Sequence, residues 1–157
     1  MATPYTPPQI ILARYADVLV NFALNSGKGV KRGEVVQCAV PDIAKPLAKE
    51  LHIALLKAGA QPIMRLIPTE FEADFYTYAN KSQLTFFPTE YFQAKTALLD
   101  HAISIIADPN PELLKNIDAK KIMLVGKSQY PYREWLFEKE RQNKFSWTLG
   151  LWGTQAK

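Results

Sequence analysis

Residues 34–67, with the sequence EVVQCAVPDIAKPLAKELHIALLKAGAQPIMRLI, decide the fold. Glu34 to Val40 is short, apolar and mostly β-branched, which predicts a strand, and Pro62 to Ile67 predicts a second one. Between them, apolar residues recur on one face at helical spacing: Ile43, Leu47, Leu51, Ala54, Leu55 and Ala58. The segment therefore predicts a strand–helix–strand unit.

The ends of this helix carry start and stop signals. Asp42 is placed to cap its N-terminus, and Pro46 falls in the first turn, where proline is tolerated. Gly59 is placed to end it, because glycine adopts the left-handed conformation of a C-terminal cap without strain.

An earlier helix is predicted from Thr6 to about Asn25. Thr6 and Gln9 have the spacing of a capping box, and Pro7 suits the first helical position. The apolar positions that follow are Ile11, Tyr15, Val18 and Phe22, with Leu12, Leu19 and Ala23 beside them.

Downstream segments continue the alternation of helices and strands. Thr69 and Glu72 have capping-box spacing and predict a short helix that ends near Asn80. The other predicted elements are a helix over 88–100, a strand over 102–107, a helical turn capped by Asn110 and a last strand over 145–151. Residues 81–87 carry no clear pattern.

Residues 121–126 fit two structures. Ile122 to Val125 alone would be a strand, whereas the wider spacing of apolar residues favours one helix from Asp118 to Asn143. Pro131 counts against that helix unless the helix is kinked.

Alternation of this kind predicts an α/β fold in three layers, with a mostly parallel sheet of about four or five strands flanked by helices on both faces. The chain of 157 residues is close to the commonest domain size, so we expect residues 1–157 to form a single domain.

Composition places the chain among globular proteins, since 48% of its residues are hydrophobic and 22% are charged. The single cysteine, Cys38, excludes an internal disulfide and favours a reducing compartment. Met1 to Pro4 lacks the features of a signal peptide, and the apolar stretch from Ile10 to Leu24 is interrupted by charges. We therefore expect a cytoplasmic protein without a membrane span.

A net charge of +4 is small. The basic residues between Lys120 and Lys144 alternate with Asp118, Glu134, Glu138 and Glu140, which favours a solvated helix face over a nucleic-acid-binding patch. We expect no nucleic-acid partner.

Two nucleotide-binding motifs are excluded by their context. Ser26-Gly27-Lys28-Gly29 follows a predicted helix and precedes a strand, the reverse of a phosphate-binding loop, so a simple turn is favoured. The first strand is followed by Val40 to Lys45, which lacks the closely spaced glycines of a dinucleotide site.

The metal-binding alternatives are weak. Asp42 and Asp108 each follow a predicted strand and could hold Mg²⁺ as in a phosphoryl-receiver domain, although helix capping and turn formation are favoured. His52 and His101 are not spaced as zinc ligands, and Cys38 is predicted to be a buried small hydrophobe. We assign no catalytic, cofactor-binding or metal-binding residue to this chain.

Aromatic residues gather in the middle of the chain: Tyr76, Tyr78, Phe86, Phe87, Tyr91 and Phe92. They indicate either a helical core or a contact surface for another domain. Trp147 and Trp152 could likewise face another domain.

Three pairs of segments together resemble the N-terminal domain of the thermophilic metallo-aminopeptidases of the aminopeptidase T and aminopeptidase S type. In order they are YADVLV (15–20) with GVKRGEVV (29–36), PLAKE (46–50) with LLKAGAQP (55–62), and REW (133–135) with FSWTLGLWGT (145–154). The resemblance runs over nearly the whole chain and favours the long helix from Asp118.

The resemblance implies a larger cytoplasmic homodimer that removes N-terminal residues from peptides with two divalent metal ions, cobalt or zinc. Their ligands would lie in a C-terminal catalytic domain absent from this chain, which would itself be inactive and shape the substrate cavity. A freestanding binding or scaffolding module remains the alternative, and an exposed apolar surface would favour the larger enzyme.

Overall fold

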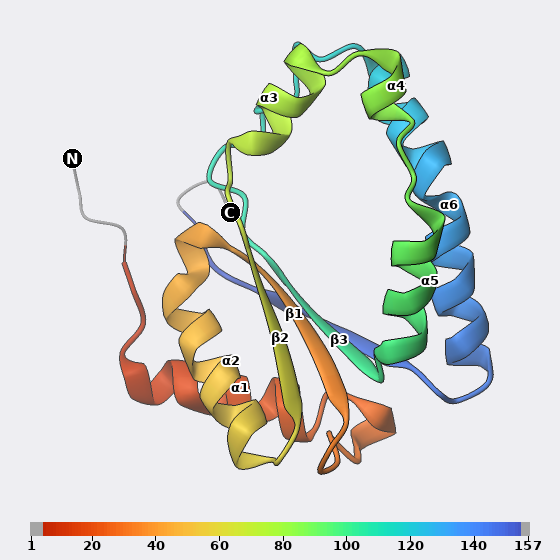
Figure 1. Ribbon diagram of the computed structural model, residues 1–157. Coiled ribbons are helices and arrows are strands. Elements are labelled where there is room, and N and C mark those ends of the chain that lie inside the picture. Colours follow the sequence, from red (N-terminus) through yellow and green to blue (C-terminus); the bar gives the residue numbers. More distant parts are fainter. Residues whose placement is uncertain (1–4, 155–157) are drawn as a thin grey trace.

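The computed structural model describes residues 5–154, in which strands alternate with helices (Figure 1). The strands are β1 (Val35–Pro41), β2 (Gln61–Ile67), β3 (His101–Ile106) and β4 (Ser146–Leu151). The α-helices are α1 (Gln9–Asn21), α2 (Lys45–Lys57), α3 (Phe71–Tyr78), α4 (Lys81–Leu84), α5 (Thr89–Leu98) and α6 (Ala119–Arg141). Two short 3₁₀ turns, η1 (Asn25–Gly27) and η2 (Asp42–Ala44), precede β1 and α2.

The strands form one parallel sheet in the order β2-β1-β3-β4, which confirms the predicted fold class. The register pairs Cys38 with Met64 on one side and with Ile103 on the other. Because paired residues of parallel strands point to the same face, each face of the sheet has a defined set of side chains.

The core lies on the face of the sheet that α1 and α2 cover. Val36, Cys38 and Val40 of β1 are completely buried there, beside Ile103 of β3. The helices contribute Leu12, Ala16, Leu19 and Val20 from α1, and Leu47, Leu51 and Leu55 from α2. The predicted buried face of α2 is thus largely confirmed. For α1 the prediction is partly wrong, since Ile11, Val18 and Phe22 are exposed.

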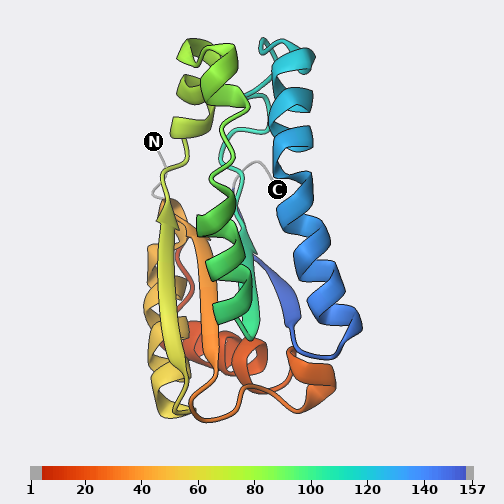
Figure 2. The same ribbon diagram turned by 45° about the vertical axis from the view of Figure 1, so that its right-hand side comes forward.

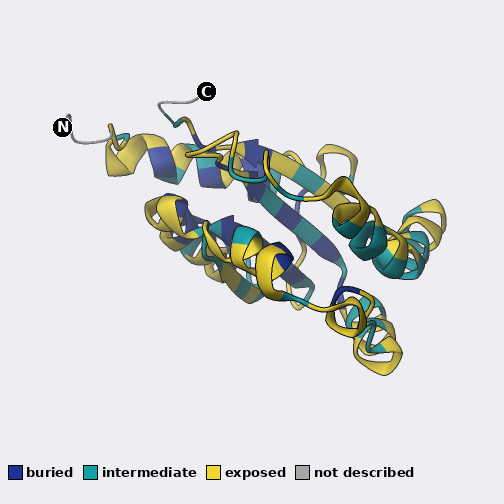
Figure 3. Cartoon of the chain, turned by 90° about the horizontal axis from the view of Figure 1, so that it is seen from above, coloured by how far each residue is buried: buried dark blue, intermediate teal, exposed yellow. Residues whose placement is uncertain are grey.

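The opposite face of the sheet, which we call the open face, contains no buried residue in any of its four strands. Its exposed apolar side chains are Ile63, Ile106, Trp147, Leu149 and Leu151. Figure 3 shows buried residues concentrated in the sheet and in the helices of the core. Helices α5 and α6, both fully described, contain none. Parallel sheets are normally covered on both faces, so a partly covered face is unusual.

Helix α6 supports α3, α4 and α5 along one side of the molecule (Figure 2). The ammonium of Lys121 donates to the carbonyl of Tyr76, at 2.6 Å, near the end of α3. The ammonium of Lys139 donates to the carbonyls of Thr96 and Leu99, at 2.8 and 2.6 Å, at the end of α5. The two lysines lie about five helical turns apart, and therefore on one face of α6, and each neutralises the negative end of a helix.

The predicted helix from Asp118 is confirmed, and the alternative strand at 122–125 is wrong. The Asp118 carboxylate caps α6 by accepting from the Lys120 amide at 2.9 Å. Pro131 lies inside α6, and one turn before it the Gly126 carbonyl accepts from the Arg133 guanidinium at 2.8 Å. This side-chain bond adds a partner for a helix carbonyl close to the proline.

Several predicted caps are wrong, although the helices themselves form. Helix α1 begins after Pro8 and α3 after Glu70, and neither helix has a side-chain cap. Asp42 lies in η2 and α2 starts after Ala44, so Asp42 does not cap it. The capping box that does form was missed: Asn80 and Gln83 cap each other's amides at the start of α4.

Met1 to Pro4, where a signal peptide was considered, lie outside the described residues. Between residues 5 and 154, no helix has the length and apolar character needed to cross a membrane.

Candidate functional site

A pocket of about 680 Å³ opens where β1, β2 and β3 end. Loops leave a parallel sheet at the carboxyl ends of its strands, and α/β proteins usually bind ligands there. Its apolar wall includes Phe71 and Phe75 from α3 and Leu113 from the turn after β3. The volume is within the range of small-molecule and short-peptide sites.

Charged groups of both signs line the same pocket. Arg65 comes from β2, Glu70 and Glu72 from the start of α3, and Asp108 from the loop after β3. The backbone carbonyl of Asp108 accepts from the Thr154 hydroxyl at 2.7 Å, which ties the segment after β4 to this loop. Apolar walls with a few charged groups can hold a peptide backbone with its side chains and orient it.

The pocket does not bring together the two residues of the alternative magnesium site, Asp42 and Asp108. Asp108 lines the pocket, but Asp42 does not. Within the described range 5–154, no group of three or more His, Cys, Asp or Glu residues lies close enough together to hold a metal ion. The donor set of these residues therefore does not fit a catalytic metal, and no chemical step through a metal can be assigned to them.

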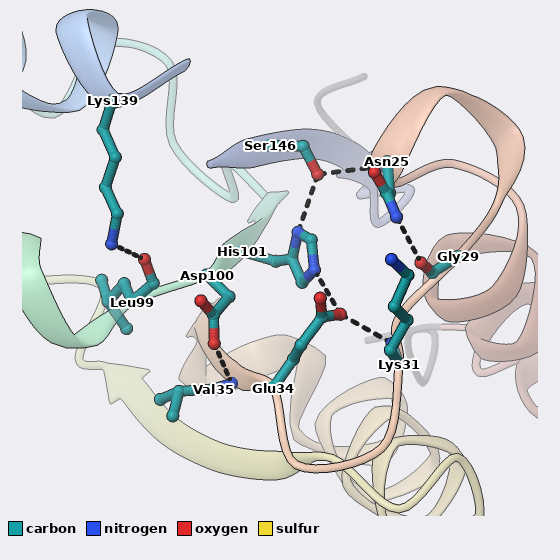
Figure 4. Close-up of polar contacts among 10 residues, drawn as sticks. All are labelled: Asn25, Gly29, Lys31, Glu34, Val35, Leu99, Asp100, His101, Lys139 and Ser146. Carbon is teal, nitrogen blue, oxygen red and sulfur yellow. Dashed lines mark hydrogen bonds and ion pairs between the residues drawn. The ribbon is translucent and has the colours of Figure 1, made fainter. Parts of the chain in front are cut away.

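His101 lies at the opposite end of the sheet, where the strands begin, and its ring contacts other residues of the chain (Figure 4). Its Nε2 is 2.8 Å from the Glu34 carboxylate, and its Nδ1 is 2.8 Å from the Ser146 hydroxyl. The Ser146 oxygen also accepts from the Asn25 amide at 2.9 Å. The ring nitrogens and the Ser146 hydroxyl are all hydrogen-bonded if Nε2 carries the ring hydrogen. In this arrangement Nε2 donates to Glu34, and the Ser146 hydroxyl donates to Nδ1. The network joins η1, β3, β4 and the loop before β1.

The charge of Glu34 is stabilised in this network. Partial burial by itself would raise the pKa of Glu34, but the hydrogen bond from the Lys31 amide and the contacts with His101 bring that pKa below its ordinary value. The carboxylate is thus an acceptor for two separate segments, at 2.6 Å from the Lys31 amide and 2.8 Å from His101.

The structure places the other histidine on the surface and the cysteine in the core. His52 is exposed on α2. Cys38 is completely buried in β1, as predicted, and burial raises the pKa of its thiol to about 12. A thiol with such a pKa is almost entirely protonated near neutral pH, whereas the thiolate is the reactive form.

The glycine-containing segment after α1 is a turn into β1, as predicted. Gly29 has a φ of +70°, and a Cβ on it would lie 2.5 Å from the backbone oxygen of Asn21. The Asn25 side chain donates to the Gly29 carbonyl at 3.4 Å, which stabilises the turn (Figure 4). Glycine is therefore required for a close approach of two backbone segments.

The aromatic residues divide between a small core and the surface. Phe87 and Phe92 are stacked with ring centres 4.9 Å apart, and they contact Trp135 and Tyr132 of α6, respectively. Tyr76 is buried, whereas Tyr78, Phe86 and Tyr91 are exposed. The suggestion that Trp152 faces another domain is wrong, because this side chain is buried in the core.

The comparisons with known proteins agree with the resemblance. The chain matches the family model of the thermophilic metalloproteases (M29) over residues 9–157. The chain therefore belongs to this metallopeptidase family. None of the curated proteins compared with it by sequence matches.

Among solved structures, the fold is similar to that of wild-type AmpT from Thermus thermophilus, with a TM-score of 0.72 and 16% sequence identity. The match covers 90% of this chain and 36% of the AmpT chain. This likeness supports the fold, and the chain spans little more than a third of that protein's length.

Sequence patterns did not reveal the two polar features of the structure. The pocket draws on 65–75 and 107–113, which are distant in the sequence, and among its lining residues the sequence analysis considered only Asp108 as a ligand-binding candidate. The network joins Glu34, His101 and Ser146, which are separated by 67 and 45 residues in the sequence. They meet only because β1, β3 and β4 are neighbouring strands of the sheet and begin at the same end of it. For the network around His101, the one available signal was a polar histidine at the start of an apolar strand.

Proposed function

We propose that this chain is the N-terminal, non-catalytic domain of a metal-dependent aminopeptidase that removes N-terminal residues from peptides. Membership in the M29 family over residues 9–157 supports the reaction class. The absence of a metal-holding cluster among residues 5–154 supports a non-catalytic role for this part. In the whole enzyme, two divalent metal ions bound outside this chain would polarise the scissile carbonyl and activate a water.

The pocket at the carboxyl ends of β1, β2 and β3 is the observation that carries the proposal. Its lining contains the aromatic side chains of Phe71 and Phe75 and the charged residues Arg65 and Glu72. In the proposed enzyme this pocket forms one wall of the substrate cavity. Its side chains bind and orient the part of the peptide beyond the scissile bond, and the size of the space limits the length of the substrate.

The exposed apolar surface supports a larger enzyme over a freestanding module. The open face exposes Ile63, Leu149 and Leu151, and the outward side of α1 exposes Val18 and Phe22. Exposed apolar side chains in this number indicate a surface that another domain covers. We assign these two surfaces to contact with the catalytic domain of the same protein.

The proposal includes the setting of the enzyme. The whole protein acts on peptides in the cytoplasm as a homodimer with cobalt or zinc, and it binds neither membranes nor nucleic acid. The acidic residues in the second half of α6 support the last point, because Glu134, Glu138 and Glu140 would repel a nucleic-acid backbone.

The size of the native protein is the first test. An antibody to this domain should detect, in lysate of the source cells, a band well above 17.8 kDa. A band at 17.8 kDa would contradict the proposal and favour the freestanding module. As a second measurement, the purified chain supplied with Co²⁺ or Zn²⁺ should retain no stoichiometric metal after desalting and should not cleave peptides.

The role of the pocket is tested in the whole enzyme. We expect Phe75→Ala to change the KM for longer peptides while leaving turnover of a dipeptide-sized substrate intact. Tyr78→Ala is the matched control, because this side chain is 82% exposed on the same helix and does not line the pocket. Equal effects of the two substitutions on KM at every peptide length would show that the pocket is not part of the substrate cavity.

A further inference from the structure

The outward side of α6 carries a row of apolar side chains at seven-residue spacing. Met123, Tyr130 and Phe137 are 58%, 56% and 46% exposed. Because seven residues complete nearly two helical turns, the three side chains lie on one face. Lys121 and Lys139, which hold α3 and α5, lie on the opposite face. We call the row of three apolar residues the α6 seam.

A shallow groove interrupts the α6 seam beside Gly126. It is lined by Met123, Gly126, Lys127, Tyr130 and Arg133. A Cβ on Gly126 would meet nothing closer than the Arg133 guanidinium at 4.0 Å, so the space beside the helix is open. A large side chain from another helix fits such a groove, as a knob fits between the residues of a facing helix.

Charges along α6 indicate the occupant and its direction. The first half of the helix, from Ala119 to Tyr130, contains only basic charges, whereas the second half, after Pro131, contains three glutamates together with Arg133, Lys139 and Arg141. An antiparallel copy of the same helix would place Lys127 of each helix against Glu134 of the other. A parallel copy would place like charges together, which is unfavourable.

We infer that α6 packs against α6 of a second copy, antiparallel, across a two-fold axis near Tyr130. This arrangement places Met123 opposite the partner's Phe137. Lys127 lies opposite the partner's Glu134, and both pairs occur twice by symmetry. The inference gives a surface to the homodimer of the proposed function and rests on that part of it alone.

The edge strand β4 is a poorer surface for self-association. The Tyr15 hydroxyl accepts from the Leu151 amide at 2.8 Å and donates to the Leu151 carbonyl at 3.4 Å. It thereby occupies backbone groups that a second strand would need. A pair of helices about 35 Å long forms a small interface, so the dimer is looked for over a wide range of protein concentrations.

Sedimentation equilibrium of the 157-residue chain tests the inference. We expect a concentration-dependent dimer, and Met123→Glu should raise its Kd at least about tenfold, equivalent to about 1.4 kcal/mol. Leu56→Glu is the matched control, because Leu56 is 54% exposed on α2, and it should leave the Kd unchanged. Circular dichroism spectra of both variants should match that of the wild-type chain, as a control for folding. A monomer at all concentrations, or a dimer that Met123→Glu does not weaken, would overturn the inference.

Charge exchange and cross-linking test the direction of the helices. Lys127→Glu and Glu134→Lys should each weaken the dimer, and the two together should restore it. Cys38 is completely buried, so an introduced cysteine would be the one accessible thiol of the described residues. Tyr130→Cys should form a disulfide-linked dimer on oxidation, whereas Phe137→Cys should not.

A Phe137→Cys dimer would contradict the antiparallel arrangement, as would failure of the charge exchange. Neither result bears on the enzymatic part of the proposed function, which the native size and the metal and peptide assays test separately. If the whole enzyme remains dimeric with Met123→Glu, the homodimer of the proposed function is retained, and α6 is not part of its interface.

Discussion

Replacing His101 by leucine tests whether the buried polar network holds the amino-terminal edge of the sheet together. The ring contacts Glu34 and Ser146, each at 2.8 Å, and leucine makes neither contact (Figure 4). A hydrogen bond to a charged group contributes about 1.5–3 kcal/mol and a neutral one about 0.5–1.5 kcal/mol. Because the Glu34 side chain is 25% exposed and can be rehydrated, the lower part of the summed range applies.

We therefore expect His101→Leu to lower the free energy of unfolding by about 2–3 kcal/mol, which corresponds to about 4–12 °C in Tm for a domain of this size. The assay is denaturant unfolding followed by circular dichroism. His52→Leu is the matched control, because His52 is exposed on α2. A loss within about 0.5 kcal/mol of the control would refute the reasoning.

The same experiment has a pH dependence with a defined sign. The folded-state pKa of Glu34 lies below its ordinary value, so its stabilising contribution is present above the unfolded pKa and is lost as the pH falls through the folded pKa. The difference in stability between the wild-type chain and His101→Leu should shrink over that acidic interval. A difference in stability that stays constant from neutral to acidic pH would show that the contact between His101 and Glu34 does not account for the stabilising effect of His101.

Three further predictions concern other parts of the fold. Gly29→Ala should cost about 2 kcal/mol or more, and Gly27→Ala clearly less, because both positions have positive φ but only the first meets backbone at 2.5 Å; equal losses in thermal unfolding would argue against the close approach. Cys38 should react with a thiol reagent only as fast as the chain unfolds, since it is completely buried; rapid labelling of the native chain would contradict this. Lys139→Met should increase hydrogen exchange in α5, because it removes the ammonium that caps this helix, whereas Lys144→Met should not.

The sequence by itself determined the order and type of most elements. A short, mostly β-branched apolar run specified β1, a second apolar run specified β2, and helical spacing with Gly59 as a stop specified α2 between them, because these signals depend on neighbours along the chain. A strand–helix–strand unit then restricts the sheet to parallel pairing. The resemblance of three ordered segments was enough to indicate the family.

Tertiary structure decided the helix starts, the partly covered sheet and the polar sites. Thr6 and Asp42 have the chemistry of caps, but the chain enters its helices at Pro8 and Ala44, so other residues occupy the capping positions. Which side of α1 is buried depended on its packing against α2 and the sheet, since apolar residues occur on both sides. Local spacing cannot encode the meeting of Glu34 with His101, because that contact exists only after β1 and β3 have paired.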